Sequence, residues 1–127
     1  MPHLFKKHYT REEARALLPQ IRRWLKGIAD RRDRLRKFDE QFAERLIQGE
    51  DLGGGPINRW VQSLAEIREL LMEFGRREIQ IKDLDRGLID FPAIIGGKEA
   101  FLCWEQDEED IEYWHDLESG FAGRERL

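Results

Sequence analysis

The sequence predicts an α+β fold: a long antiparallel helical hairpin with unequal arms, then a small three-stranded antiparallel sheet and a short C-terminal helix. Three observations lead to this prediction. Apolar residues recur with a heptad period in the first part of the chain, a Gly-Pro-rich segment interrupts that part, and the period becomes two after Glu78. Because 127 residues are enough for one domain, we expect residues 10–76 and 78–127 to be two parts of a single domain.

The first helix begins at a capping box. In Thr10-Arg11-Glu12-Glu13, Thr10 is the N-cap and Glu13 can accept a hydrogen bond from its amide. A heptad pattern typical of a coiled coil then continues for about 35 residues and ends near Gly49. Pro19 removes one backbone hydrogen bond of this helix, so we expect a bend near residues 15–19.

The second helix is shorter than the first and follows the break at residues 51–56. At about 1.5 Å per residue, the two helices would span about 60 Å and about 30 Å. The second helix would then cover only the half of the first that lies nearest the connection, roughly residues 30–49. The apolar residues of the other half need a partner, either the C-terminal part or a second copy of the chain: Leu17, Leu18, Ile21, Trp24, Leu25 and Ile28.

Three strands are expected after the hairpin, at residues 79–82, 88–95 and 99–105. Gly96-Gly97 is a strong signal for a two-residue turn. Counting outward from that turn places Asp90 opposite Cys103. Pro92 cannot donate a ladder hydrogen bond, which indicates a bulge or an edge position. The acidic residues 107–110 then predict the first turn of a helix that ends near Glu118, with Gly120 as its left-handed C-cap.

Composition excludes several classes of protein. A net charge of −4 argues against a protein that coats nucleic acid over its whole surface. No window approaches the roughly 18 apolar residues of a membrane span, and the start of the chain lacks the apolar stretch of a signal peptide. The single cysteine excludes an intramolecular disulfide. We therefore expect a cytoplasmic protein without membrane partners.

The candidate binding residues lie in the C-terminal third. On a helix, Trp114, His115 and Glu118 would share one face, and a histidine with carboxylates can bind a metal or act as a general base. The alternative is a histidine that is hydrogen-bonded to a neighbouring carboxylate in a packed contact. The ligand-binding hypothesis comprises Lys82, Asp85, Asp90, Trp104, Trp114, His115, Glu118 and Arg124; any metal would be bound by His115 and Glu118. No catalytic residue or cofactor is assigned.

Three further features are interpreted structurally. We expect Arg124 to pair with Asp85 or Asp90 and so to fasten the C-terminal tail. Cys103 is interpreted as a small buried filler, because an ionised aspartate opposite it would raise the pKa of the thiol. The basic run 31–37 could bind RNA phosphates, but carboxylates four residues away from several of its cations favour a solvated helix face.

Several strings of this sequence resemble one family. They are Ile81–Pro92, Leu102-Cys103-Trp104, Tyr113-Trp114-His115 and Gly120–Arg124, together with the opening Tyr9–Pro19. The chain is similar, over nearly its whole length, to an uncharacterised prokaryotic family, domain of unknown function 2203. The resemblance implies a single-domain cytoplasmic protein and no particular activity.

Three hypotheses for function follow. The favoured one is a non-enzymatic binding or assembly module that forms a homodimer, or binds a protein partner, through Leu17, Ile21, Trp24, Leu25 and Ile28 of the first helix. The alternative is a small-ligand or metal site, which could be enzymatic, around His115. RNA binding through residues 31–37 comes third.

Overall fold

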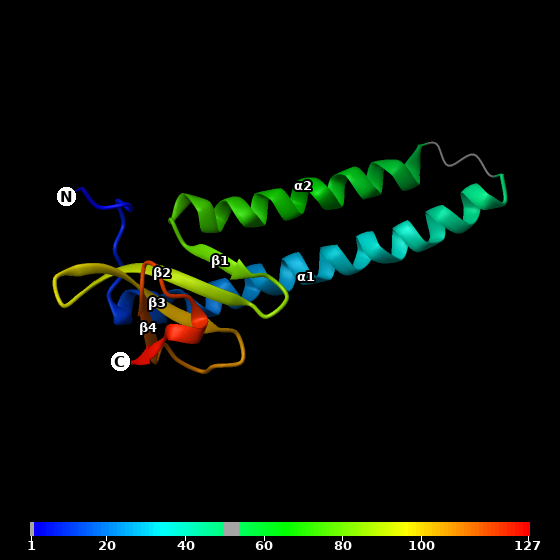
Figure 1. Ribbon diagram of the computed structural model, residues 1–127. Coiled ribbons are helices and arrows are strands. Elements are labelled where there is room, and N and C mark those ends of the chain that lie inside the picture. The colour runs from blue at the N-terminus through cyan, green and yellow to red at the C-terminus, as the bar shows by residue number, and fades with distance from the viewer. Residues whose placement is uncertain (1, 50–53) are drawn as a thin grey trace. The chain divides into compact units, whose positions relative to one another are not determined.

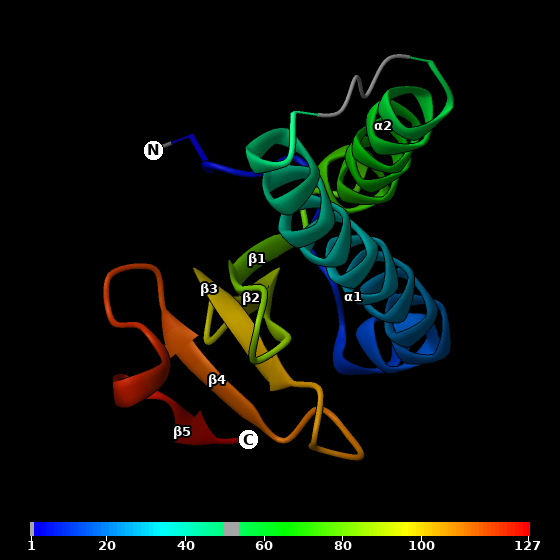
Figure 2. The same ribbon diagram turned by 90° about the vertical axis from the view of Figure 1, so that its right-hand side faces the viewer.

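The computed structural model describes residues 2–49 and 54–127 (Figure 1). Two helices, α1 (Arg11–Ile47) and α2 (Gly55–Arg76), precede a five-stranded antiparallel sheet and confirm the α+β class. The strands follow chain order, as Figure 2 shows: β1 (Gln80–Asp83), β2 (Leu88–Ile95), β3 (Lys98–Glu105), β4 (Tyr113–Asp116) and β5 (Glu125–Arg126), with a 3₁₀ turn, η1 (Phe121–Gly123), before β5. Of the predicted break, residues 51–53 lie outside the described residues, and Gly55 and Pro56 begin α2.

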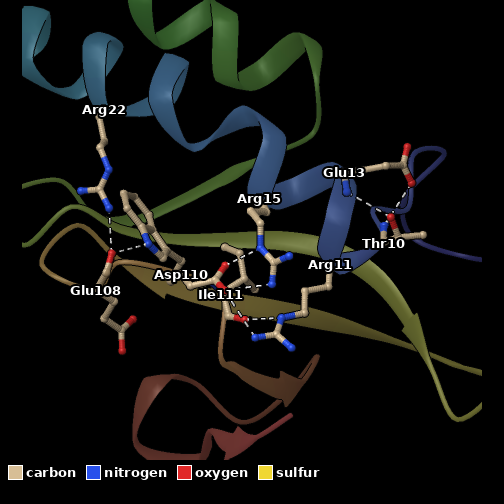
Figure 3. Close-up of polar contacts among 9 residues, drawn as sticks. Thr10, Arg11, Glu13, Arg15, Arg22, Glu108, Asp110 and Ile111 are labelled. Carbon is tan, nitrogen blue, oxygen red and sulfur yellow. Dashed lines mark hydrogen bonds and ion pairs between the residues drawn. The ribbon is translucent and has the colours of Figure 1, made fainter.

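The chain divides into two compact units. The first contains Met1–Arg22 and Glu73–Leu127, and the second contains Arg23–Met72. In the first unit, the predicted capping box is confirmed: the Thr10 amide donates to Glu13 Oε1 and the Glu13 amide donates to Thr10 Oγ1, both at 3.1 Å. The helix that starts here is attached to the turn after β3, where Arg15 makes a bidentate contact with Asp110 at 2.8 and 2.9 Å (Figure 3).

The sheet has two chemically different faces. Its register confirms the predicted pairing of Asp90 with Cys103, and residues two apart on a strand share a face. The inner face carries Ile89, Phe91 and Trp104 and packs against the start of the chain. The Tyr9 ring lies 5.5 Å from the Phe91 ring, and the Arg22 guanidinium lies 4.9 Å from the Trp104 ring. The outer face carries Leu88, Asp90, Phe101, Cys103, Tyr113 and His115.

Pro92 occupies an edge position, as predicted. The pairing of β2 with β1 ends at Asp90, so Pro92 lies beyond the last β1 partner. Its carbonyl instead accepts a hydrogen bond from the Tyr9 amide at 2.7 Å. The proline therefore leaves no strand partner unsatisfied, because none of β1 lies beside it.

In the second unit, α2 lies antiparallel to α1. Trp60 Nε1 donates to Asp39 Oδ1 at 3.2 Å, Arg31 Nε donates to Glu66 Oε2 at 2.6 Å, and a Cβ on Gly27 would lie 3.1 Å from Leu70 Cδ1. The second helix thus reaches Gly27, farther toward the start of α1 than predicted. Trp60, near the start of α2, already lies beside Asp39. Helix α2 therefore runs alongside a part of α1 that begins before residue 30, where the predicted pairing began.

The apolar surface expected on α1 is not exposed. Leu18, Ile21, Trp24, Leu25 and Ile28 are only 4, 0, 7, 6 and 0% exposed, and Leu17 is half-buried. Of the two partners left open by the sequence, the C-terminal part covers the start of α1 in the first unit, and α2 also reaches Gly27 in the second. The homodimer through Leu17, Ile21, Trp24, Leu25 and Ile28 therefore loses the observation on which it rested.

The predicted C-terminal helix is also wrong. Residues 113–116 form β4, which pairs with β3 through Leu102–Trp114 and Phe101–His115. The acidic segment before it is a turn, in which the Glu105 amide donates to Glu108 Oε1 at 2.8 Å. Gly120 is extended, with φ −95° and ψ −155°, and is not a left-handed cap. Aromatic residues favour strands, and the ladder with β3 stabilises them more than an isolated short helix could.

Candidate functional site

A cavity of about 220 Å³ lies on the outer face of the sheet. Lys82 of β1, Asp90 of β2, Phe101 of β3 and His115 of β4 each line it. Leu88 and residues 117–121, which follow β4, complete the wall. Four neighbouring strands and the C-terminal segment therefore contribute to one concave site.

Asp90 and His115 form a buried pair in the wall of this cavity. Their side chains are 2% and 3% exposed, and His115 Nε2 lies 2.9 Å from Asp90 Oδ2. The other ring nitrogen, Nδ1, lies 2.7 Å from the Asp116 carbonyl oxygen. Because a carbonyl only accepts hydrogen bonds, Nδ1 carries a proton. A second proton must then lie between Nε2 and Oδ2, so the two side chains share it and the pair is neutral overall.

The second oxygen of Asp90 is the unusual atom of the site. Oδ1 is buried and has no hydrogen-bond partner within residues 2–49 and 54–127. Burial raises the pKa of Asp90, although His115, Cys103 and Lys82 act to lower it. A buried polar atom without a partner costs free energy, so binding of a donor to Oδ1 would recover that free energy.

Cys103 lies beside this pair. Its Sγ, a carboxylate oxygen of Asp90 and a ring nitrogen of His115 all lie within 4.8 Å of one another. Thiolate, imidazole and carboxylate together are a donor set that suits Zn²⁺. Burial, followed by the charge of Asp90, raises the pKa of the thiol to about 12, so Cys103 is a poor nucleophile and binds a metal only after losing a strongly held proton.

Arg124 holds in place the segment after β4, residues 117–121, which covers part of the outer face of the sheet. Its guanidinium makes a bidentate ion pair with Glu108, with N–O distances of 2.9 and 3.1 Å. Its Cζ also lies over two aromatic rings, 3.9 Å from the Tyr113 centroid and 4.1 Å from the Phe121 centroid. Since Phe121 lines the cavity, this contact holds part of the cavity wall in place. The prediction that Arg124 pairs with Asp85 or Asp90 was wrong. Asp90 pairs with His115, and the partner of Arg124 is Glu108, which lies in a turn that was predicted to be helical.

Residues 7–127 match the family described as an uncharacterized conserved protein, DUF2203. The chain belongs to the DUF2203 family. This match confirms the resemblance found in the sequence. No curated protein and no solved structure matches the chain. Within the described parts of this DUF2203 protein, neither helix is long and apolar enough to cross a membrane.

The cavity brings together four of the eight proposed binding residues of the DUF2203 chain: Lys82, Asp90, His115 and Glu118. Trp104 and Trp114 lie on the inner face, opposite Ile89 and Leu102. Asp85 lies in the turn between β1 and β2, and Arg124 lies beside the cavity wall. Six further residues line the cavity and were not predicted from the sequence: Leu88, Phe101, Leu117, Ser119, Gly120 and Phe121. Interpreting Tyr113–Asp116 as a strand would have placed Phe101 beside His115.

A larger groove lies between the helices of the second unit. Its volume is about 450 Å³, and Arg34, Lys37 and Trp60 are among the residues that line it. Asp33 pairs with Lys37 at 3.0 Å and with Arg36, and Arg31 pairs with Glu66. Much of the basic run 31–37 is thus neutralised by its own neighbours, which gives RNA binding little support. The outer-face cavity, by contrast, is lined by Asp90, whose Oδ1 lacks a hydrogen-bond partner in the described part of the chain.

Proposed function

We propose that this DUF2203 protein is a small-molecule-binding domain whose ligand occupies the outer-face cavity. The observation that carries the proposal is Asp90, which lines the cavity and whose buried Oδ1 has no hydrogen-bond partner among the residues that the structure describes. A ligand with an N–H or O–H donor would satisfy this oxygen, and the free energy otherwise lost to its desolvation would then favour binding.

The other lining residues narrow the ligand class. Lys82 and Glu118 are exposed side chains of opposite charge that line the same cavity. Its apolar wall consists of Leu88, Phe101, Leu117 and Phe121. The volume is below the roughly 300–1,000 Å³ of sites for drug-sized molecules. A small zwitterion fits this arrangement: its ammonium group would donate to Asp90, its carboxylate would face Lys82, and a short apolar body would contact the wall. Free α-amino acids are the simplest molecules of this class.

The proposal is binding without catalysis. A catalytic role would need an activated nucleophile or a base with a free lone pair. Cys103 is protonated because burial raises its pKa to about 12. His115 Nδ1 donates to a backbone carbonyl, and Nε2 shares a proton with Asp90. The pair therefore offers a fixed hydrogen-bonding surface to a ligand.

Calorimetric titration with each of the twenty protein amino acids tests the proposal. We expect saturable binding of at least one of them. Lys82→Gln should weaken that binding by about tenfold or more, because a hydrogen bond to a charged group contributes about 1.5–3 kcal/mol. Lys98→Gln is the matched control, since Lys98 is an exposed lysine of the same sheet that does not line the cavity. Absence of binding, or equal affinities of the two variants, would reject the proposed site.

Asp90→Asn separates ligand binding from folding. An asparagine amide can donate to His115 Nε2 and so preserve the buried contact, while its carbonyl oxygen is a weaker acceptor for an ammonium group than a carboxylate oxygen. We expect weaker amino-acid binding with a folded protein. Unchanged affinity would show that Asp90 does not contact the ligand.

A further inference from the structure

A second cluster of ligating side chains lies outside the cavity, where the segment before α1 meets the start of β3. Ligand atoms of His3, His8 and Glu99 all lie within 4.8 Å of one another. His8 Nε2 lies 2.8 Å from Glu99 Oε2, and the His3 and His8 rings are in edge contact with centroids 5.0 Å apart. None of these three residues lines the outer-face cavity.

Glu99 is fixed in position by the backbone. The Leu4 amide donates to Oε1 at 2.8 Å, and the Phe5 amide donates to Oε2 at 3.0 Å. The two backbone amides and His8 therefore hold the carboxylate in one orientation, which is how outer-shell hydrogen bonds prepare a metal ligand.

We propose that His3, His8 and Glu99 bind a zinc ion. Two imidazoles and one carboxylate suit a borderline divalent metal, and three protein ligands leave a fourth position for water. The ion would replace the proton that His8 Nε2 now donates to Glu99. Both oxygens of Glu99 keep lone pairs beyond those used by the two backbone amides, so a carboxylate oxygen can still coordinate the metal.

Such an ion would link the N-terminal segment to the hairpin of β2 and β3. Glu99 is the second residue of β3, close to the turn at Gly96-Gly97. The same segment already contacts β2 through the hydrogen bond from the Tyr9 amide to the Pro92 carbonyl. Because a ligand that binds only the folded chain stabilises it, saturating zinc should raise the Tm by several degrees, on the order of 3 °C or more.

Calorimetric titration of zinc into the chelator-treated chain is the test. We expect one ion per chain, and a loss of affinity of about tenfold or more in both His3→Ala and His8→Gln. Cys103→Ser is the control, because Cys103 belongs to the other cluster of ligating groups. Since His3 is exposed, His3→Ala should leave the Tm of the zinc-free chain unchanged, which separates lost binding from lost folding.

Paramagnetic Ni²⁺ gives an independent readout by NMR. The chain has three histidines, so their ring signals can be followed individually. We expect Ni²⁺ to broaden the signals of His3 and His8 and to leave that of His115 sharp. The proposal is overturned if the wild type binds no zinc, if the His3→Ala/His8→Gln double variant binds it as well as the wild type does, or if Cys103→Ser loses it.

Discussion

Removing the Arg124 guanidinium should destabilise the first unit strongly. In Arg124→Gln, a bidentate pair with Glu108 is lost, and such charge-assisted hydrogen bonds contribute about 1.5–3 kcal/mol. The contacts with the Tyr113 and Phe121 rings add about 0.5–1 kcal/mol each. Allowing for a side chain that is 17% exposed, we expect a loss of about 2–4 kcal/mol. At about 3 °C per kcal/mol for a chain of this size, the Tm should fall by about 6–12 °C.

Arg126→Gln is the matched control for this prediction. Arg126 is two residues away, its side chain is 71% exposed, and its contact with Glu112 is 3.8 Å long. Thermal unfolding followed by circular dichroism should therefore show almost no change in this variant. If Arg124→Gln lowers the Tm no more than Arg126→Gln does, the C-terminal tail is not fastened through Glu108 and the reasoning is refuted.

Three further predictions concern buried and ionised groups. Burial raises the pKa of Asp90 above 3.8, so the stability that this carboxyl contributes is lost as the pH rises through its folded pKa. The Tm of Asp90→Asn should therefore rise relative to that of the wild type as the pH increases. A Tm difference that stays constant with pH would contradict this prediction. Glu99 has its pKa lowered from 4.5 to about 2, so the Tm difference between the wild type and Glu99→Gln should shrink as the pH falls from 4.5 toward 2, and a widening difference would reverse the assigned sign. Ile21→Glu places a charge at a position that is 0% exposed. The variant should be destabilised by about 3–5 kcal/mol and should be unfolded, as measured by circular dichroism. A folded variant that changes only from dimer to monomer in light scattering would instead support Ile21 as part of a dimer interface.

The parts of the fold that local rules determine were predictable. The capping box at Thr10 and Glu13 needs only the spacing of two residues, and it forms as expected. The register of β2 and β3 follows from the Gly96-Gly97 turn, because the side-chain period of a strand is fixed at two. These features depend on neighbours in sequence, which a single sequence reveals.

The errors arose where a distant segment decides the structure. The acidic residues 107–110 satisfy the rules for a helix N-terminus, yet Asp110 pairs with Arg15 and Glu108 with Arg124, both far away in sequence. These ion pairs stabilise a turn, and β3 supplies the ladder for β4. No local pattern contains that information. For the same reason, the sequence left open whether the C-terminal part or a second chain covers Ile21, since this depends on the packing of the sheet against α1.

Half of the proposed binding residues line one cavity, although His115 was predicted to lie in a helix and lies in strand β4. His115 and Glu118 were grouped by helical spacing, whereas both line the cavity because β4 ends between them and the chain turns back. Asp90 was placed near this region by the strand register alone. The missing partner of Asp90 Oδ1 is a property of the packed structure, so the sequence could not indicate it.

Amide chemical-shift mapping tests the proposed ligand site most directly. The ¹⁵N-labelled chain is titrated with the amino acid that binds best by calorimetry, or with all twenty in turn. We predict that the shifted amides belong to Lys82, residues 88–90 and residues 117–121, with the largest changes at Asp90 and in the segment that covers the outer face. Shifts confined to residues 23–72, or no shift with any of the twenty, would contradict a ligand site in the outer-face cavity.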